Sequence, residues 1–207
     1  MIDFAILAVF IPTFFFVSVT PGMCMTLSMT LGMTIGVRRS LPMMWGELIG
    51  VALVSIASVI GVAAVMLNYP AIFLLLKYLG GGYLFWLGIQ MWRSRGKLAI
   101  PDNLDEAVDT SPIGLAMQGF VTAIANPKGW AFMISLLPPF INTDNALVPQ
   151  LSVLISIILI TEFSCLLLYA SGGRTLRRFL QQRGNVQMLN RIAGSLMMGV
   201  GIWLAAG

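Results

Sequence analysis

Long apolar runs separated by short polar stretches fill most of the sequence. A helix that crosses a membrane needs roughly 20 apolar residues, and six runs reach about that length. They are Phe4 to Leu31, Leu41 to Leu67, Ala71 to Trp92, Ile113 to Leu137, Leu147 to Ser171 and Val186 to Ala206. The pattern predicts an all-α integral membrane protein with six transmembrane helices in a single domain, residues 1–207.

Composition supports the membrane assignment. Of the 207 residues, 58% are hydrophobic and only 10% are charged, and the mean hydropathy is +0.91. These values lie far from the usual balance of a soluble domain. The longest connection, 93–112, is too short to form a soluble domain, so any function must lie within the helix bundle.

The basic residues are distributed unevenly between the two sides of the predicted bundle. Ten of the twelve follow the first, third and fifth runs: Arg38 and Arg39; Arg93, Arg95 and Lys97; Arg174, Arg177, Arg178, Arg183 and Arg191. Cytoplasmic loops carry an excess of lysine and arginine, so the connector 93–112 is predicted to be cytoplasmic and both termini periplasmic. These arginines lie against a membrane, so lipid is an expected partner and nucleic acid is not. The stretch 172–191 fits either a plain basic loop or a short amphipathic helix on anionic headgroups, with Leu176, Phe179 and Leu180 facing inward.

Two short motifs indicate that the chain consists of two inverted repeats, approximately 1–95 and 110–207. The first run contains FVSVTPGM, residues 16–23, and the fourth contains FVTAIANPKG, residues 120–129. Each has Phe-Val, then a hydroxyl residue, then a proline near the middle of its run. Three-helix repeats of opposite orientation are common in transporters.

A proline inside a helix removes one backbone hydrogen bond and obstructs another. In a bilayer, the freed groups are tolerated only where they are buried in protein or line a polar cavity. A simple kink explains one such proline, but two matched prolines beside Thr20, Asn126 and Lys128 favour a shared binding site. The first and fourth helices are therefore predicted to be broken, at Pro21 and Pro127.

Lys128 is the most unusual residue of this predicted site, because a lysine deep in a membrane is costly unless it is paired or faces water. Glu47 of the second run and Glu162 of the fifth are the two carboxylates that could compensate its positive charge. One or both could simply pair with Lys128. Alternatively, one could bind and release a proton, since the chain contains no histidine to do so.

Small residues in GMTIG (32–36), GELIG (46–50) and GGG (80–82) predict close helix packing. A homodimer is a reasonable expectation from the same pattern. The fourteen methionines are mostly expected to fill the core, although they also suit an adaptable wall for a partly apolar ligand.

Four stretches resemble the LysE/RhtB family of bacterial amino-acid exporters, in order over almost the whole chain. They are TPGM (20–23), LKYLGGGYLFWLGIQMWRS (76–94), NPKGWAFMISLLPPF (126–140) and RIAGSLMMGVGIWLA (191–205). The chain departs from the family pattern in two places. Met23 stands where a second proline is usual, and Glu47 lies where a small apolar residue is more common.

The resemblance implies export of an amino acid or a derivative across the bacterial inner membrane, driven by the proton motive force through alternating access. Expected substrate-binding residues are Thr20, Pro21, Gly22, Met23, Asn126, Pro127 and Lys128. Lys128 would take the α-carboxylate, while Thr20, exposed carbonyls and a carboxylate would take the ammonium group. Protonation of Glu47 or Glu162 would bias the alternation between inward-open and outward-open states.

Two other functions fit a six-helix membrane protein. A transmembrane thiol or electron carrier would use Cys24 and Cys165, but Cys24 has Trp130 as its counterpart in the fourth run rather than a cysteine. A passive small-solute channel is the other alternative. An enzyme is not expected, because the sequence lacks histidine, a phosphate-binding glycine loop and a GxSxG motif. No cofactor or metal is expected either.

Overall fold

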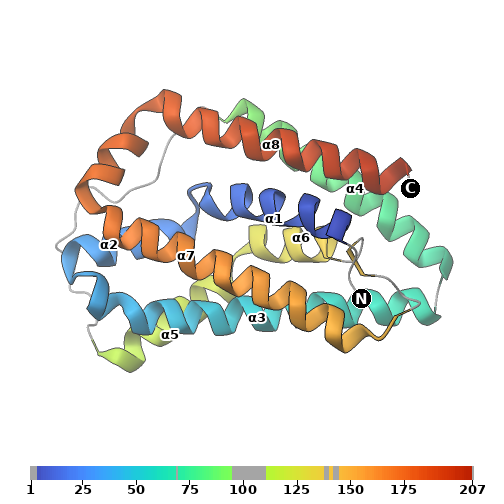
Figure 1. Ribbon diagram of the computed structural model, residues 1–207, viewed down its shortest axis with the longest axis horizontal. Coiled ribbons are helices and arrows are strands. Elements are labelled where there is room, and N and C mark those ends of the chain that lie inside the picture. Colours follow the sequence, from blue (N-terminus) through green and yellow to red (C-terminus); the bar gives the residue numbers. More distant parts are fainter. Residues whose placement is uncertain (1–3, 69, 95–110, 138–139, 142–144, 207) are drawn as a thin grey trace.

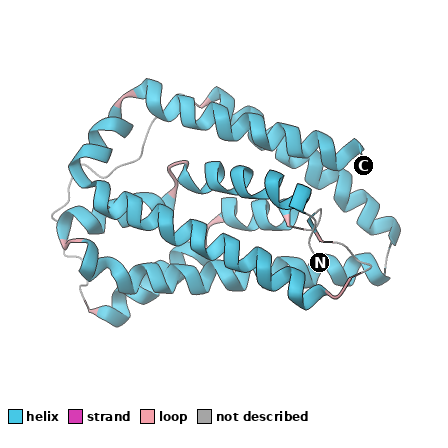
Figure 2. Cartoon of the chain, in the orientation of Figure 1, coloured by secondary structure: helices cyan, strands magenta, loops and turns pink. Residues whose placement is uncertain are grey.

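The computed structural model describes residues 4–68, 70–94, 111–137, 140–141 and 145–206 (Figure 1). These residues form helices and loops and contain no strand (Figure 2). The helices are α1 (Phe4–Val19), α2 (Met23–Thr34), α3 (Val37–Asn68), α4 (Pro70–Arg93), α5 (Pro112–Ile124), α6 (Pro127–Leu136), α7 (Leu147–Gln181) and α8 (Arg183–Ala206). The predicted all-α fold is confirmed.

Each of the six apolar runs is helical, and two of them are interrupted where the sequence places a proline. The first run divides into α1 and α2 around Pro21, and the fourth divides into α5 and α6 just before Pro127. The helices lie roughly along the longest axis of the molecule, and both termini are at the same end (Figure 1). Most of the connector, residues 95–110, lies outside the described residues.

Two helical stretches among the described residues are long and apolar enough to cross a membrane by themselves, Val37–Gly61 and Leu147–Gly173. A third candidate span is the bent pair Leu7–Val19 and Met23–Thr34, whose two parts meet at 56°. The protein thus has membrane-compatible helices. The complete set of six spans stays a prediction.

Three helix pairs make the closest contacts: α4 with α8, α3 with α5, and α2 with α7. Glycines allow the close approach in each pair. A side chain at Gly46 would run into the carbonyl of Ala116, and one at Gly32 would run into the backbone of Ala170. Gly81 similarly faces the carbonyl of Gly201 at 2.9 Å from the position of an added Cβ. The small-residue motifs therefore serve contacts within the chain, and the homodimer stays a prediction.

Helix α7 extends beyond the predicted end at Ser171. It kinks at Gly173, whose φ of 44° lies in the left-handed region that favours glycine. The segment 174–181 is helical after the kink, as the amphipathic alternative requires. Leu180 is buried against the core, but Phe179, expected to face inward, is exposed.

The buried side chains form two clusters on either side of the helix breaks. One cluster includes Phe10, Phe14, Phe132 and Phe140. The other is rich in methionine and includes Met25, Met29, Met43 and Met44. The expected role of methionine as core filler is confirmed for these four residues, and the breaks occupy the region between the clusters.

Candidate functional site

The first helix break comprises Thr20, Pro21 and Gly22, between the end of α1 and the start of α2. In a continuous helix, the N–H of residue 21 would bond to the carbonyl of Val17. Proline has no N–H, so it leaves this carbonyl without its helical donor. The 56° bend at the break also separates the other terminal carbonyls of α1 from the amides of α2.

Three side chains satisfy carbonyls at this end of α1, and two of them come from distant parts of the chain. The Lys128 ammonium donates to the Val17 carbonyl at 3.3 Å, and the Tyr169 hydroxyl donates to the Val19 carbonyl at 2.8 Å. Thr20 donates its hydroxyl proton to the Phe16 carbonyl at 2.6 Å. The break is therefore stabilised by specific hydrogen bonds from side chains, which a simple proline kink does not require.

The second break separates α5 from α6 and uses a helix cap. The Asn126 Oδ1 accepts a hydrogen bond from the backbone N–H of Lys128 at 3.1 Å, as an N-cap residue does. Pro127 occupies the first turn of α6, where its missing N–H costs nothing. The Trp130 indole N–H donates to the Ile124 carbonyl at 2.8 Å, so Trp130 closes the end of α5.

Three charged side chains from three helices converge on the breaks: Glu47 of α3, Lys128 of α6 and Glu162 of α7. Glu162 accepts a hydrogen bond from the Ser18 hydroxyl at 2.8 Å, and it is attracted electrostatically to Lys128. Glu47 is only 1% exposed and interacts with Glu162 and with the Cys24 thiol. Its Oε2 has no hydrogen-bond partner among the residues that the structure describes.

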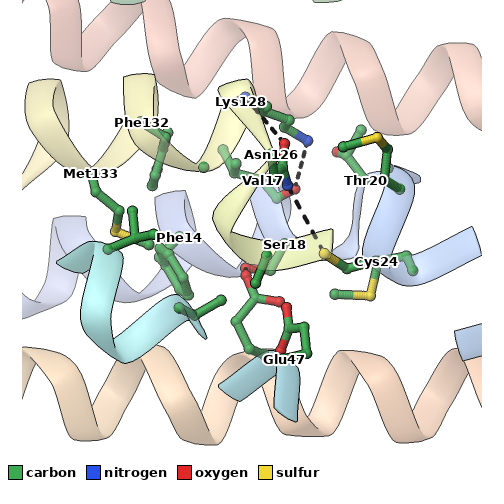
Figure 3. A pocket seen from close by; sticks show the side chains of 18 residues that line it. Phe14, Val17, Ser18, Thr20, Cys24, Glu47, Asn126, Lys128, Phe132 and Met133 are labelled. Atoms are coloured by element: carbon green, nitrogen blue, oxygen red, sulfur yellow. Dashed lines mark hydrogen bonds between the residues drawn. The ribbon is translucent and has the colours of Figure 1, made fainter. Parts of the chain in front are cut away.

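These side chains line a small cavity of about 70 Å³ (Figure 3). Figure 3 shows Lys128 and Asn126 on one side of this cavity and Glu47 on the opposite side. Its apolar wall includes Phe14, Phe132 and Met133. The small cavity thus offers a cation, two carboxylates and an apolar surface within one space.

A larger cavity of about 720 Å³ adjoins the small one and shares Thr20, Gly22, Met23 and Lys128 with it. It extends past Thr30 of α2, Ser94 at the end of α4 and Asn190 in the first part of α8. This end of the bundle also carries the exposed Arg38, Arg39 and Arg93, and we call it the basic end. The small cavity is therefore approached from the basic end.

Aromatic side chains fill the opposite side of the small cavity. The ring of Phe14 lies 5.8 Å from that of Phe132 and 5.7 Å from that of Phe10. Phe10 in turn packs edge-on against Phe140 at 5.0 Å. We call these four residues the aromatic seal. All four are at most 2% exposed, so the cavity is closed toward the end that holds the termini.

Comparison with known proteins assigns the family. A family model described as LysE type translocator matches residues 15–207. The chain belongs to the LysE type translocator family. The resemblance found in the sequence is confirmed, and family membership makes this protein a membrane transporter rather than an enzyme.

Several relatives match this LysE type translocator over most of its length. An uncharacterized membrane protein of Vibrio cholerae is 30% identical, covering 91% of this chain and 90% of the relative. A homoserine/homoserine lactone efflux protein of Salmonella typhimurium is 26% identical, covering 91% and 90%. A leucine efflux protein of an Enterobacter species is 26% identical, covering 93% and 91%. No solved structure matches the chain.

The translocator brings almost all of the predicted site residues together. The small cavity is lined by Thr20, Gly22, Met23, Glu47, Asn126, Lys128 and Glu162. Pro21 lines the larger cavity. The side chain of Pro127 lies outside the described residues, although its position at the start of α6 is described.

Sequence reasoning missed three kinds of contributor in this translocator. Ser18 orients Glu162, Tyr169 caps the broken end of α1, and the aromatic seal closes one side of the cavity. Ser18 carried a usable signal, because it is a polar residue two positions before Thr20 in an apolar run. Tyr169 and the phenylalanines carried none, since such residues occur throughout transmembrane helices.

Proposed function

We propose that this translocator exports an amino acid or a close derivative across the bacterial inner membrane. The observation that carries the proposal is the convergence of Lys128, Glu47 and Glu162 on the two helix breaks. A zwitterionic amino acid needs one cationic and one anionic contact at its α-carbon, and this site supplies both. The efflux activities named for the Salmonella and Enterobacter relatives support both the outward direction of transport and an amino acid or its derivative as the substrate.

The lining of the small cavity supports a specific mode of binding. The Lys128 ammonium is hydrogen-bonded to a neutral carbonyl at 3.3 Å, so an incoming α-carboxylate offers it a stronger, charge-assisted bond. The substrate's ammonium group then faces Glu47 and Glu162, with Thr20 and the carbonyls of the first break nearby. Its side chain lies along Phe14 and Phe132.

Transport proceeds by alternating access, coupled to the proton motive force through a buried carboxylate. The larger cavity gives entry from the basic end, while the aromatic seal blocks the other end. Export requires the converse state, in which the seal opens and the helices around the larger cavity close. Binding of substrate or proton shifts this equilibrium only as far as it favours one state over the other.

The proposed topology has six spans in two inverted repeats, with both termini in the periplasm. Helix α3 packs against both parts of the fourth run, α5 and α6, and α7 packs against both parts of the first, α1 and α2. Helices α4 and α8 pack against each other. A two-fold axis that exchanges the two repeats would produce these three sets of helix contacts. Carboxy-terminal fusions test it: alkaline phosphatase should be active and green fluorescent protein dark, and the reverse result refutes the topology.

Efflux from proteoliposomes tests the function. Proteoliposomes loaded with radiolabelled L-leucine or L-homoserine should release one or both amino acids when a proton gradient is imposed. This release should be faster than that from protein-free liposomes loaded in the same way. Lys128→Ala should lower the apparent affinity at least about 30-fold, since losing one partner of a buried charged pair costs about 2–5 kcal/mol. Arg39→Ala is the matched control, because this exposed cation lies outside both cavities. Equal efflux from wild type and Lys128→Ala would refute the site.

A further inference from the structure

We infer that Glu47 is the carboxylate at which the substrate's ammonium group and a proton replace one another, and that Glu162 is a carboxylate held in place by Ser18. The inference rests on the proposed function and assigns separate roles to two carboxylates that the sequence leaves equivalent. Its basis is the different set of partners that each carboxylate has in the cavity.

Glu162 already has its partners. Its Oε1 accepts a hydrogen bond from Ser18 at 2.8 Å, and the positive charge of Lys128 acts on it from α6. Ser18 belongs to the last turn of α1, so this hydrogen bond ties α7 to the broken helix. A carboxylate held in this way is suited to keeping its position through the transport cycle.

Glu47 is in the opposite situation. It is 1% exposed, and its Oε2 has no hydrogen-bond partner among the described residues. Leaving a buried acceptor unpaired costs about 1–3 kcal/mol, and more if the group is charged. The carboxylate also lines the small cavity, on the side opposite Lys128 (Figure 3). Glu47 therefore needs either a proton of its own or a cation from the cavity.

The titratable groups around Glu47 do not supply that cation. Helix α2 contributes the Cys24 thiol, and α7 contributes Glu162 and the Cys165 thiol. Helix α6 contributes Lys128, whose ammonium is directed to the Val17 carbonyl. Helix α5 has no charged residue, and Arg93, the charged residue of α4 whose side chain is described, does not line the cavity. The groups of α2 and α7 make a second negative charge beside Glu162 unfavourable, so ionised Glu47 requires a bound cation.

An amino acid brings that cation to the free oxygen. Glu47 starts as a carboxylic acid, and the bound ammonium group converts it to a carboxylate while one proton leaves to the solvent. When the substrate is released on the other side, Glu47 takes up a proton there before the site returns. Each cycle thus exchanges one amino acid for one proton. A zwitterionic substrate has no net charge, so one positive charge moves inward and the membrane potential contributes to the driving force.

Proton release on binding tests the assignment. Purified wild-type protein in detergent and weak buffer is mixed with L-leucine or L-homoserine, and released protons are followed with a pH indicator. The wild type should release about one proton per bound molecule. Over the pH range in which it does so, its apparent Kd should fall about tenfold for each unit by which the pH is raised. Glu47→Gln should bind without release, while Glu47→Asp should restore release with altered affinity. Glu162→Gln should bind more weakly but still release a proton.

The outcomes separate this inference from the proposed function. If wild-type protein neither binds nor transports either amino acid, the proposed function fails. If it binds and transports but Glu47→Gln still releases a proton, the assignment of Glu47 is wrong. The inference is also wrong if Glu162→Gln binds the substrate without releasing a proton. This second measurement tests the inference even if Glu47→Gln does not fold.

Discussion

The ammonium group of Lys128 donates a hydrogen bond to the carbonyl oxygen of Val17, at 3.3 Å. This is the carbonyl that Pro21 deprives of its helical donor. The bond joins the first turn of α6 to the last turn of α1, so it links the two helix breaks directly. A substrate carboxylate that draws Lys128 away also frees the Val17 carbonyl, which gives substrate binding a direct effect on the break in α1.

Tyr169 should stabilise the first break through its hydroxyl alone. Tyr169→Phe removes the donor to the Val19 carbonyl and leaves a buried acceptor unpaired, at a cost of about 1–3 kcal/mol. For a chain of this size, each kcal/mol lowers the melting temperature by about 2–4 °C. Thermal unfolding in detergent measures the shift. The control is Tyr78→Phe on the exposed face of α4; an equal shift in both variants would show that the hydroxyl of Tyr169 has no special role.

Close packing of α3 on α5 should depend on the absence of a side chain at Gly46. Gly46→Ala places a methyl group against the Ala116 carbonyl, and overpacking of this kind costs about 1–3 kcal/mol. Gly61→Ala on the same helix meets nothing within 4 Å and should be neutral or slightly stabilising. The yield of monodisperse protein and its melting temperature report the difference. Indistinguishable variants would contradict the close contact.

The aromatic seal should prevent leakage through the cavity. Phe14→Ala removes the ring that contacts both Phe10 and Phe132, so proteoliposomes containing this variant should dissipate a proton gradient faster than wild type. An internal pH-sensitive dye measures the rate, and Phe14→Leu should leak less than Phe14→Ala. Phe15→Ala is the control, since Phe15 is an exposed neighbour on α1. If a correctly folded Phe14→Ala variant dissipates the proton gradient no faster than wild type, Phe14 is not part of the barrier to leakage.

The two cysteines should be dispensable for transport. Both are free and buried, and buried cysteines commonly act as small apolar residues. The double variant Cys24→Ala, Cys165→Ala should retain proton-driven efflux within a few-fold of wild type, because the proposed binding mode uses neither thiol as a contact for the substrate. A thiol or electron carrier would lose all activity on this change. Complete loss of transport in the folded double variant would revive that alternative.

Local chemistry in the sequence was enough to predict the helical class and the positions of both breaks. Six apolar runs of membrane-crossing length dictate helices, because a bilayer requires every backbone group to be satisfied within its own segment. Pro21 and Pro127 interrupt this bonding wherever they lie in space. Lys128, Glu47 and Glu162 were recognisable for the same reason, since charged groups in apolar runs need a polar environment.

Only the tertiary structure decided which partners these residues have. Tyr169 caps a carbonyl that lies 150 positions earlier in the chain, and Ser18 binds a carboxylate 144 positions away. Such pairs follow from the crossing of packed helices, which short-range patterns do not encode. The difference between Glu162, which is held by Ser18, and Glu47, whose Oε2 has no partner among the described residues, arises in the same way. Two carboxylates that look alike in sequence acquire separate environments because different helices surround them.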